Sequence, residues 1–347
     1  MTFDPTAAAF ADSGIYGLPY SVAESRVVVL GVPFAATTSY GGGAEDGPAA
    51  IVNASRQVDL FDGETGRPYE AKIAYSDELE HLRTLHARVR PLASRVIEVG
   101  GDIGDDENLH NALSAVNEAS EQVNDDVYEA VRRWHAQGKL VALVGGDHST
   151  PFGAIRALAE AHQDVGILHI DAHADLRVAY EGFRYSHASI MHNVATLVPQ
   201  VSRIVQVGIR DFSEDEAHTI ATSSGRIVSF FDHSLAEQKL CGVPWSKLVE
   251  PIIDALPAKV YVSFDIDGLD PCLCPNTGTP VPGGLSYHEA SYLLGALMRS
   301  NKLIVGCDIN EVAPGHDGTE WDANVGARLL YKLIGRMLQT HAVERTR

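Results

Sequence analysis

The chain alternates between short apolar runs and longer segments with helical spacing. Six runs are almost entirely apolar and rich in β-branched residues, which is typical of strands buried on both faces of a sheet. They are 26–32, 140–144, 165–170, 203–207, 259–264 and 303–307. Helical spacing covers 107–137, 151–162, 287–299 and 324–341, with Ser286 and Asp322 expected to cap the last two. Strands that alternate with helices predict a three-layer α/β/α fold with a mainly parallel sheet.

No linker, repeat or low-complexity tract divides the sequence. Residues 1–24 are small, polar and turn-prone, and we expect an N-terminal arm that lies over the body or over a neighbouring subunit. The chain has 347 residues and 45% apolar content, which is enough to bury one full-sized core. Residues 25–347 are therefore expected to form a single domain.

The acidic balance of the chain narrows its partners. A formal net charge of -19 repels phosphate backbones, so we expect no nucleic-acid binding, and it favours cationic small molecules. No apolar run approaches the roughly 18 residues of a membrane span, and the first residues do not resemble a signal peptide. The four cysteines are interpreted as free thiols. These features predict a cytoplasmic protein that binds no membrane.

Polar side chains follow four of the predicted strands at the point where each strand ends. They are His148 after 140–144, Asp171, His173 and Asp175 after 165–170, Asp265 and Asp267 after 259–264, and Glu311 after 303–307. Ligands of parallel α/β sheets bind at the carboxyl ends of the strands, so these side chains are expected to converge. Alternate residues of an extended chain share a face, which places Asp171, His173 and Asp175 together.

The first six of these side chains suit a metal centre better than they suit turns. Alone, the motif around His148 fits a turn and the Asp265 motif fits a solvated loop, whereas Asp171-x-His173-x-Asp175 after an apolar strand already favours a metal. Burying so many carboxylates without cations would cost several kcal/mol per charge. Carboxylate and imidazole ligands favour Mn²⁺-like ions, and six ligands are more than one ion with an open site needs. We therefore predict two divalent ions at this edge. His169 lies on the same face, and we interpret it as a support for the ligands or as a core residue.

Three motifs resemble the signatures of the ureohydrolase family, which includes arginase and agmatinase. They are Gly145-Gly-Asp-His-Ser149, Asp171-Ala-His-Ala-Asp175 and Ser263-Phe-Asp-Ile-Asp-Gly-Leu-Asp-Pro271. The resemblance implies a binuclear hydrolase of guanidino compounds, with 25–347 as its catalytic domain. It also implies one ion held by His148, Asp171, Asp175 and Asp265, and another held by Asp171, His173, Asp265 and Asp267. Attack on a guanidinium needs hydroxide, and water between two dications ionises near neutral pH.

The same resemblance assigns two catalytic residues. Glu311 matches a glutamate that grips the guanidinium, and a carboxylate can accept two parallel N–H bonds from such a fork. His187 matches the proton shuttle, although Ala188 follows it where the family usually has glycine. His192 is the second candidate for that role.

The substrate is less constrained than the reaction. Arg177 stands where arginases have an asparagine, which argues against arginine, and its charge would oppose the ammonium of agmatine unless Glu181 or Asp211 neutralises it. Arg177, Asp211 and Tyr180 are expected to contact the substrate together with Glu311. Several other segments are similar to a ureohydrolase branch that includes guanidine and metformin hydrolases.

In that interpretation Tyr180, Phe183 and Trp321 close a small apolar pocket. We therefore place free or substituted guanidine first and agmatine second, with guanidino acids open.

The sequence also bears on two alternatives to a homo-oligomeric hydrolase. Enzymes of the histone-deacetylase type have an adjacent His-His pair, which this sequence does not contain. A non-catalytic subunit of a hetero-oligomer would have broken ligands, whereas all six are intact. The resemblance implies a trimer or hexamer, with a paralogous partner subunit as the alternative. The resemblance to the whole family favours Mn²⁺ as the metal, and the resemblance to the branch with guanidine and metformin hydrolases makes Ni²⁺ the alternative.

Overall fold

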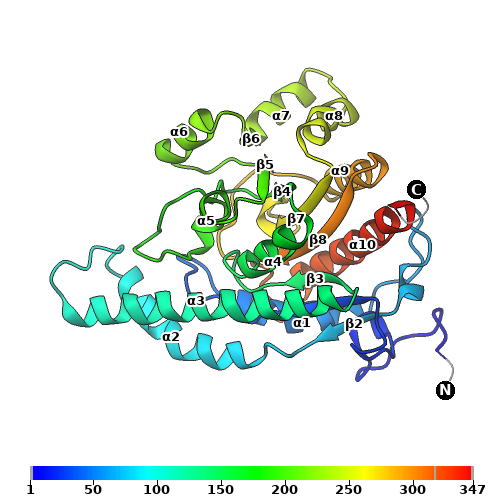
Figure 1. The fold of residues 1–347 in the computed structure, drawn as a ribbon, viewed down its shortest axis with the longest axis horizontal. Helices are drawn as coiled ribbons and strands as arrows, with labels where there is room; N and C mark the ends of the chain where they lie inside the picture. The colour runs from blue at the N-terminus through cyan, green and yellow to red at the C-terminus, as the bar shows by residue number, and fades with distance from the viewer. Residues whose placement is uncertain (1–2, 316–317, 345–347) are drawn as a thin grey trace.

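In the computed structural model, which describes residues 3–315 and 318–344, eight parallel strands form one sheet in the order β2-β1-β3-β8-β7-β4-β5-β6 (Figure 1). The strands are β1 (Val27–Gly31), β2 (Ile73–Ser76), β3 (Leu140–Val144), β4 (Val165–Ile170), β5 (Val201–Val207), β6 (Ile227–Phe230), β7 (Lys259–Asp265) and β8 (Leu303–Asn310). This sheet confirms the predicted α/β class with parallel strands.

Helices cover both faces of the sheet. They are α1 (Gly47–Ser55), α2 (His81–Ile97), α3 (Glu107–Ala136), α4 (Phe152–His162), α5 (Ile190–Leu197), α6 (Glu214–Thr222), α7 (Asp232–Leu240), α8 (Trp245–Ala255), α9 (Tyr287–Arg299) and α10 (Trp321–Glu344). Strand side chains alternate between two cores: Leu140 and Ala142 pack on the side of α1, α8, α9 and α10, while Val141 and Leu143 pack on the side of α2 to α5. A three-layer arrangement follows from this alternation.

The central strands agree with the predicted ranges, and the edges of the sheet do not. β3 and β4 have the predicted bounds, while β7 and β8 extend to include Asp265 and Asn310. The pattern missed β2 and β6, which have four residues each and lie at the two edges. Short edge strands carry too few apolar positions to show the pattern of a buried strand.

One predicted helix cap is confirmed and the other is wrong. Ser286 caps α9, and its hydroxyl and the Glu289 side chain form a reciprocal capping box. Asp322 lies inside α10, which begins at Trp321, and its carboxylate accepts hydrogen bonds from the backbone and side-chain amides of Asn276. The acid therefore anchors the loop between β7 and α9 instead of capping α10.

The segment before β1 packs on the body of its own chain. Ile15, Tyr16 and Leu18 are buried in the core beneath α10, and the Tyr16 hydroxyl donates to the carbonyl of Ala327 at 3.1 Å. The Lys139 ammonium donates to the carbonyls of residues 22, 23 and 25. The division into an arm and one domain stays a prediction, and its ends at residues 1 and 347 lie outside the described residues.

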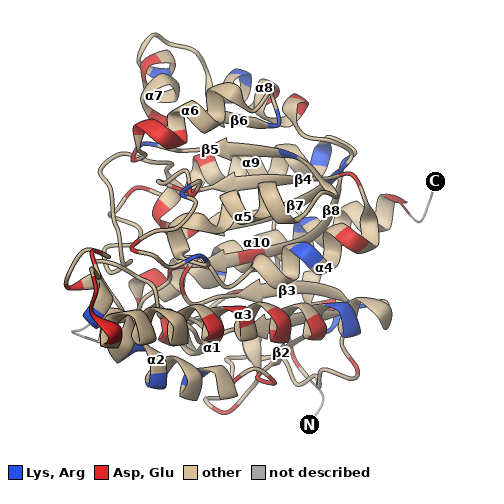
Figure 2. Cartoon of the chain, turned by 60° about the vertical axis from the view of Figure 1, so that its left-hand side comes forward, with Lys and Arg blue, Asp and Glu red and all other residues tan. Residues whose placement is uncertain are grey.

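The charge of the molecule is carried partly by its outer helices. Figure 2 shows acidic residues, in red, at several positions along α3, on the outside of the fold. Among the described residues, no helix is both long enough and apolar enough to cross a bilayer.

Candidate metal centre

The candidate ligands lie at one edge of the sheet because their strands are neighbours. β3, β8, β7 and β4 are adjacent in the sheet and parallel, so the segments that follow them leave on the same side. Glycines let these segments pack closely: a Cβ on Gly146 would lie 1.9 Å from the Phe34 carbonyl oxygen, and one on Gly268 would lie 2.7 Å from the Asp171 nitrogen. The motif glycines are therefore required by close backbone approach.

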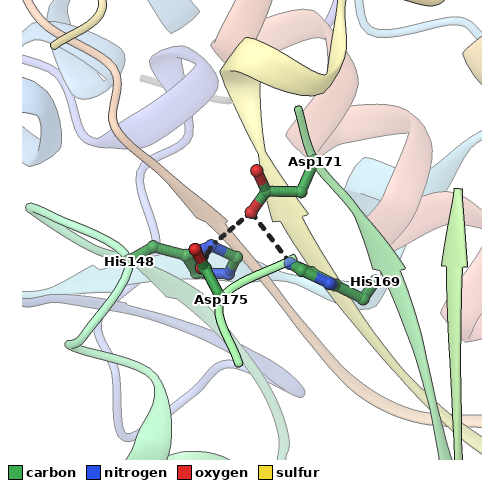
Figure 3. A group of neighbouring side chains, drawn as sticks. All are labelled: His148, His169, Asp171 and Asp175. Atoms are coloured by element: carbon green, nitrogen blue, oxygen red, sulfur yellow. Dashed lines mark hydrogen bonds and ion pairs between the residues drawn. The ribbon is translucent and has the colours of Figure 1, made fainter. Parts of the chain in front are cut away.

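The first group of candidate ligands consists of His148, Asp171, Asp175 and Asp265, whose carboxylates surround the Nδ1 atom of His148. Figure 3 shows His148, Asp171 and Asp175 together with His169. This atom lies 2.9 Å from Asp171 Oδ2, 3.2 Å from Asp175 Oδ2 and 3.4 Å from Asp265 Oδ2. All four side chains are buried. Three carboxylate oxygens thus converge on one imidazole nitrogen.

A second group shares Asp171 with the first. His173 Nδ1 lies 3.1 Å from Asp267 Oδ2 and 3.5 Å from Asp171 Oδ1. Asp265 adjoins this group through its Oδ1 atom, which accepts the Asp267 backbone N–H at 2.8 Å. The six residues expected as ligands are therefore brought together, and Asp171 faces both groups.

His169, which the sequence suggested as a support for the ligands or as a core residue, directly contacts the candidate ligand Asp171. Its Nε2 atom lies 2.8 Å from Asp171 Oδ2, and its Nδ1 atom faces the Gln206 amide at 3.0 Å. An amide N–H that donates to Nδ1 leaves the ring proton on Nε2, where it can donate to Asp171. This geometry suits a residue that orients a ligand. Its position on the Asp171 face of β4 was the signal for it.

The electrostatics of the cluster indicate a shortage of positive charge. Burial and then the neighbouring Asp171 raise the pKa of Asp175 to about 7. Burial together with Asp267 and Asp171 raises the pKa of Asp265 well above its ordinary range. Burial opposes the charge of His148, but hydrogen bonds to Asp171, Asp175 and Asp265 raise its pKa well above normal. Left to itself, this cluster retains protons that cations would replace.

The donor set fits two hard or borderline divalent cations. Within the described residues two overlapping groups could each hold an ion, one with His148, His169, Asp171 and Asp175 and one with Asp171, His173 and Asp267. Both groups consist of oxygen and imidazole donors, which suit Mn²⁺ or Ni²⁺ better than thiolate-preferring ions. The chemistry of the residues therefore matches the predicted binuclear centre.

A small cavity opens beside His173 and Asp175. Its volume is about 260 Å³, and its lining includes Arg177, Tyr180, His187, Asp211, Glu216 and Thr279. Of the substrate contacts predicted from the sequence, Arg177, Tyr180 and Asp211 lie here. Glu216, Thr279 and the exposed Tyr40 were not predicted, and for Glu216 the only signal was its capping box with Ser213.

Arg177 is paired, but with neither of the acids that the sequence suggested. Its Nε atom lies 3.7 Å from Glu216 Oε2, and its guanidinium carbon lies 4.8 Å from the centre of the Tyr180 ring. Asp211 Oδ2 lies 4.0 Å from His173 Nε2, and 69% of the Asp211 side chain is exposed. The lining of the cavity thus contains three carboxylates, from Asp175, Asp211 and Glu216, beside the guanidinium of Arg177.

Of the two predicted catalytic residues, His187 lines the cavity that the described residues form and Glu311 does not. Burial lowers the pKa of His187 to about 4. Glu311 is buried, has a positive φ of 61°, and accepts the His148 backbone N–H at 3.0 Å through Oε1. Its Oε2 atom has no hydrogen-bond partner within the described residues.

Burial and the neighbouring Asp147 raise the pKa of Glu311 well above normal. Glu311 is thus directed into the cluster, although it does not line the cavity as the described residues define it.

Three other candidates lie away from the cavity that the described residues form. Phe183 is buried in the core, and Trp321 donates its indole N–H to the Cys272 carbonyl at 3.0 Å. The predicted apolar lid of Tyr180, Phe183 and Trp321 is therefore wrong for the last two residues. His192 also lies outside the lining, and its backbone N–H donates to Asp175 O at 3.0 Å.

Comparisons with known proteins agree with the geometry. A family model described as "Arginase family" matches residues 25–335. The chain is 36% identical to an N(1)-aminopropylagmatine ureohydrolase of Thermus thermophilus, with 91% of each chain covered. It is 31% identical to a protein of the same name from Synechocystis, covering 91% of this chain and 90% of that one.

Among solved structures, an agmatine ureohydrolase of Thermoplasma volcanium superposes with a TM-score of 0.72 at 26% identity, covering 96% of this chain and 97% of that one.

Proposed function

Because the chain belongs to the arginase family, we propose that it hydrolyses agmatine or an N-substituted agmatine to urea and the corresponding amine. Members of this family are ureohydrolases that cleave C–N bonds of guanidino compounds, and this protein is one of them. The proposal concerns which guanidino compound is cleaved.

The observation that carries the proposal is the acidic cavity beside the metal cluster. A guanidinium bound near Asp175 leaves room in the cavity for a chain, and the lining also contains the carboxylate of Asp211, which is 69% exposed and lies 4.0 Å from His173. An amine at the end of that chain is cationic at neutral pH and would be attracted by Asp211. The net charge of -19 favours the approach of such a substrate.

Arg177 does not exclude a cationic tail. Its charge is balanced by Glu216 at 3.7 Å and lies over the face of Tyr180 at 4.8 Å. A guanidinium that is held in this way is already engaged with an anion and an aromatic ring. Its repulsion of a nearby ammonium is correspondingly reduced.

The size of the cavity favours agmatine over free guanidine, which the sequence placed first. A volume of about 260 Å³ is several times the roughly 30 Å³ that one water molecule occupies. Free guanidine would leave most of this space to water, whereas a tailed substrate fills it. The names of the relatives favour the same order.

The residues of the chain divide the reaction between them. Two divalent cations, when bound by the His and Asp cluster, would supply the Lewis acidity that brings the pKa of water near neutrality. We propose that Glu311 orients the guanidinium through its free oxygen atom. The oxygen of a water molecule adds to the guanidinium carbon, and the bond from that carbon to the substituted nitrogen breaks. His187 takes the proton that the water gives up and carries it to the nitrogen of the leaving amine. The products are urea and the amine.

The assay that tests the proposal measures urea from agmatine, N1-aminopropylagmatine, free guanidine, metformin, arginine and 4-guanidinobutyrate. The protein is loaded separately with Mn²⁺ and with Ni²⁺, and bound metal is counted. We expect the highest kcat/KM for one of the two agmatine compounds, with two ions per chain. Urea released only from free guanidine would overturn the choice of substrate and restore the first sequence prediction.

The assembly is a separate proposal. A homotrimer or homohexamer is the state implied by the family, and no paralogous subunit is needed if the purified chain alone turns over substrate. Activity that appears only after a second subunit is added would favour the hetero-oligomer.

A further inference from the structure

His187 has one ring nitrogen that faces two hydroxyl groups. Its Nδ1 atom lies 3.3 Å from Ser186 Oγ and 3.5 Å from Thr37 Oγ1. The ring is buried but lines the cavity, so Nε2 is the nitrogen left for contact with substrate or water. Which nitrogen carries the proton decides what His187 can do there.

The Thr37 hydroxyl is committed as a donor elsewhere. It donates to Asp147 Oδ2 at 3.1 Å, and a carboxylate accepts but does not donate. The same oxygen accepts the backbone N–H of His187 at 3.1 Å. Toward Nδ1, the Thr37 oxygen can therefore act only as an acceptor.

Asp147 is held firmly enough to fix this direction. It is fully buried, and its Oδ2 atom also accepts the Thr37 backbone N–H at 3.2 Å. Its Oδ1 atom accepts the backbone N–H of Ser149 at 3.1 Å and the Ser149 hydroxyl. Both oxygens of the carboxylate are thus occupied by donors from two different loops.

We propose that Thr37 is a positioning residue that holds the proton of His187 on Nδ1 and leaves Nε2 as the nitrogen that exchanges protons in the cavity. This inference rests on the proposed function, in which His187 carries a proton from water to the leaving amine. With a lone pair at Nε2, the neutral ring accepts a proton from the attacking water as its O–H bond breaks. The same Nε2 then donates that proton to the nitrogen of the leaving amine, so the ring returns to its starting state.

Ser186 offers the opposing arrangement. Its hydroxyl oxygen accepts the Ala188 backbone N–H at 3.2 Å, but its own proton is free to point at Nδ1. If it did so, Nδ1 would be an acceptor and the proton would sit on Nε2. Thr37 and Ser186 therefore predict different tautomers, which makes the inference testable without turnover.

The first experiment reads the tautomer directly. Full-length protein is labelled with ¹⁵N in its histidine rings, freed of paramagnetic ions, and examined by NMR near pH 7.5, with the His187 signals assigned from a His187→Gln variant. We expect a protonated Nδ1 and an unprotonated Nε2. A proton on Nε2 would overturn the proposal, whether or not the protein turns over agmatine.

The second experiment separates positioning from structural support. Thr37→Val keeps the size of the side chain but removes the hydroxyl, while Thr37→Ser retains it. For Thr37→Val we expect kcat to fall by about 10- to 100-fold with KM little changed, and the ¹⁵N signals to show a mixture of tautomers. Thr37→Ser should restore both.

A Thr37→Val variant with wild-type kcat and the wild-type tautomer would overturn the role. If wild-type protein releases no urea from any substrate, the substrate proposal fails while the NMR result still decides the tautomer.

Discussion

Asp171 connects the two halves of the candidate metal centre. Its Oδ2 atom faces His148 and His169, while its Oδ1 atom faces His173. No other carboxylate among the described residues belongs to both candidate groups. The loss of this side chain should therefore affect both ions at once.

Replacing Asp171 or Asp265 by Asn should remove metal and activity together. Each change keeps the shape of the side chain but removes a negative charge that a divalent ion needs. We expect urea release to fall by more than about 100-fold and bound metal to fall below two ions per chain. Metal analysis and the urea assay measure this, with Asp125→Asn on the exposed side of α3 as control. Near-normal turnover by either variant would argue against the centre.

Glu311→Ala should separate metal binding from catalysis. The side chain accepts the His148 backbone N–H but is not one of the candidate ligands, so both ions should be retained. Urea release should fall by about 100-fold or more, because the guanidinium loses the carboxylate that orients it. If metal is lost along with activity, Glu311 acts on the ligands instead of on the substrate.

Asp211→Asn should weaken the binding of a substrate with a cationic tail. The carboxylate lines the cavity and 69% of its side chain is exposed, so its attraction for an ammonium is partly screened by water. We expect KM for agmatine to rise about three- to tenfold with kcat little changed, and KM for free guanidine to change less. Asp215→Asn, exposed on the nearby α6, is the matched control. Equal effects of the two variants would point to long-range charge alone.

Two capping boxes show how identical local motifs differ in function. Ser286 with Glu289 begins α9, and Ser213 with Glu216 begins α6. Only the second box lies beside the cavity, where the Glu216 side chain also accepts the Leu176 backbone N–H at 3.0 Å and faces Arg177. The helix start of α6 is thus part of the cavity lining.

Ser286→Ala and Ser213→Ala should lower stability alike but differ in catalysis. Each removes a hydroxyl that caps a helix, which typically costs about 1 kcal/mol in free energy of unfolding. Ser213→Ala should also release Glu216 and raise KM, while Ser286→Ala should leave KM unchanged. Denaturant unfolding and steady-state kinetics measure the two effects. An unchanged KM in Ser213→Ala would show that Glu216 stays in place without its cap.

The sequence predicted the centre of this fold better than its periphery. Central strands such as β3 and β4 are buried on both faces, so their apolar runs were unambiguous and the polar residues after them marked the site. The position of Glu216 could not be predicted, because it depends on how α6 packs against the segment that carries Arg177. The direction of the Glu311 side chain depends on a left-handed backbone turn, which a local pattern does not indicate.

At the scale of the whole molecule, a histidine pair that is not part of the candidate metal centre should make stability depend on pH. The rings of His135 and His162 lie 4.9 Å apart at the ends of α3 and α4. Burial, then the nearby His135, lowers the pKa of His162 from 6.5 to about 4. In the unfolded chain this histidine binds a proton at a higher pH than in the folded protein. Stability is therefore lost as the pH falls from 6.5 toward 4.

His162→Gln should reduce this loss. Above pH 6.5 the His162 ring is neutral in both the folded and the unfolded protein, so protonation makes no difference there between the stabilities of wild type and variant. Between pH 6.5 and 4 it should retain about 1 to 2 kcal/mol that the wild type loses, a figure reduced because water reaches part of the ring. Urea unfolding at pH 7.5 and 4.5 measures the difference, with exposed His288→Gln as control. Parallel pH profiles for wild type and His162→Gln would exclude this origin.

The strand order also determines how the protein can form while it is being synthesised. β8 lies between β3 and β7, yet it is the last strand to leave the ribosome. Until it emerges, β3 has an open edge and the segments that follow β3 and β4 have no fixed relation to each other. A nascent chain that ends before residue 303 therefore exposes unpaired strand edges and cannot assemble the cluster. Interrupted translation should yield an aggregation-prone, metal-free fragment, so this enzyme can become active only after β8 has been made.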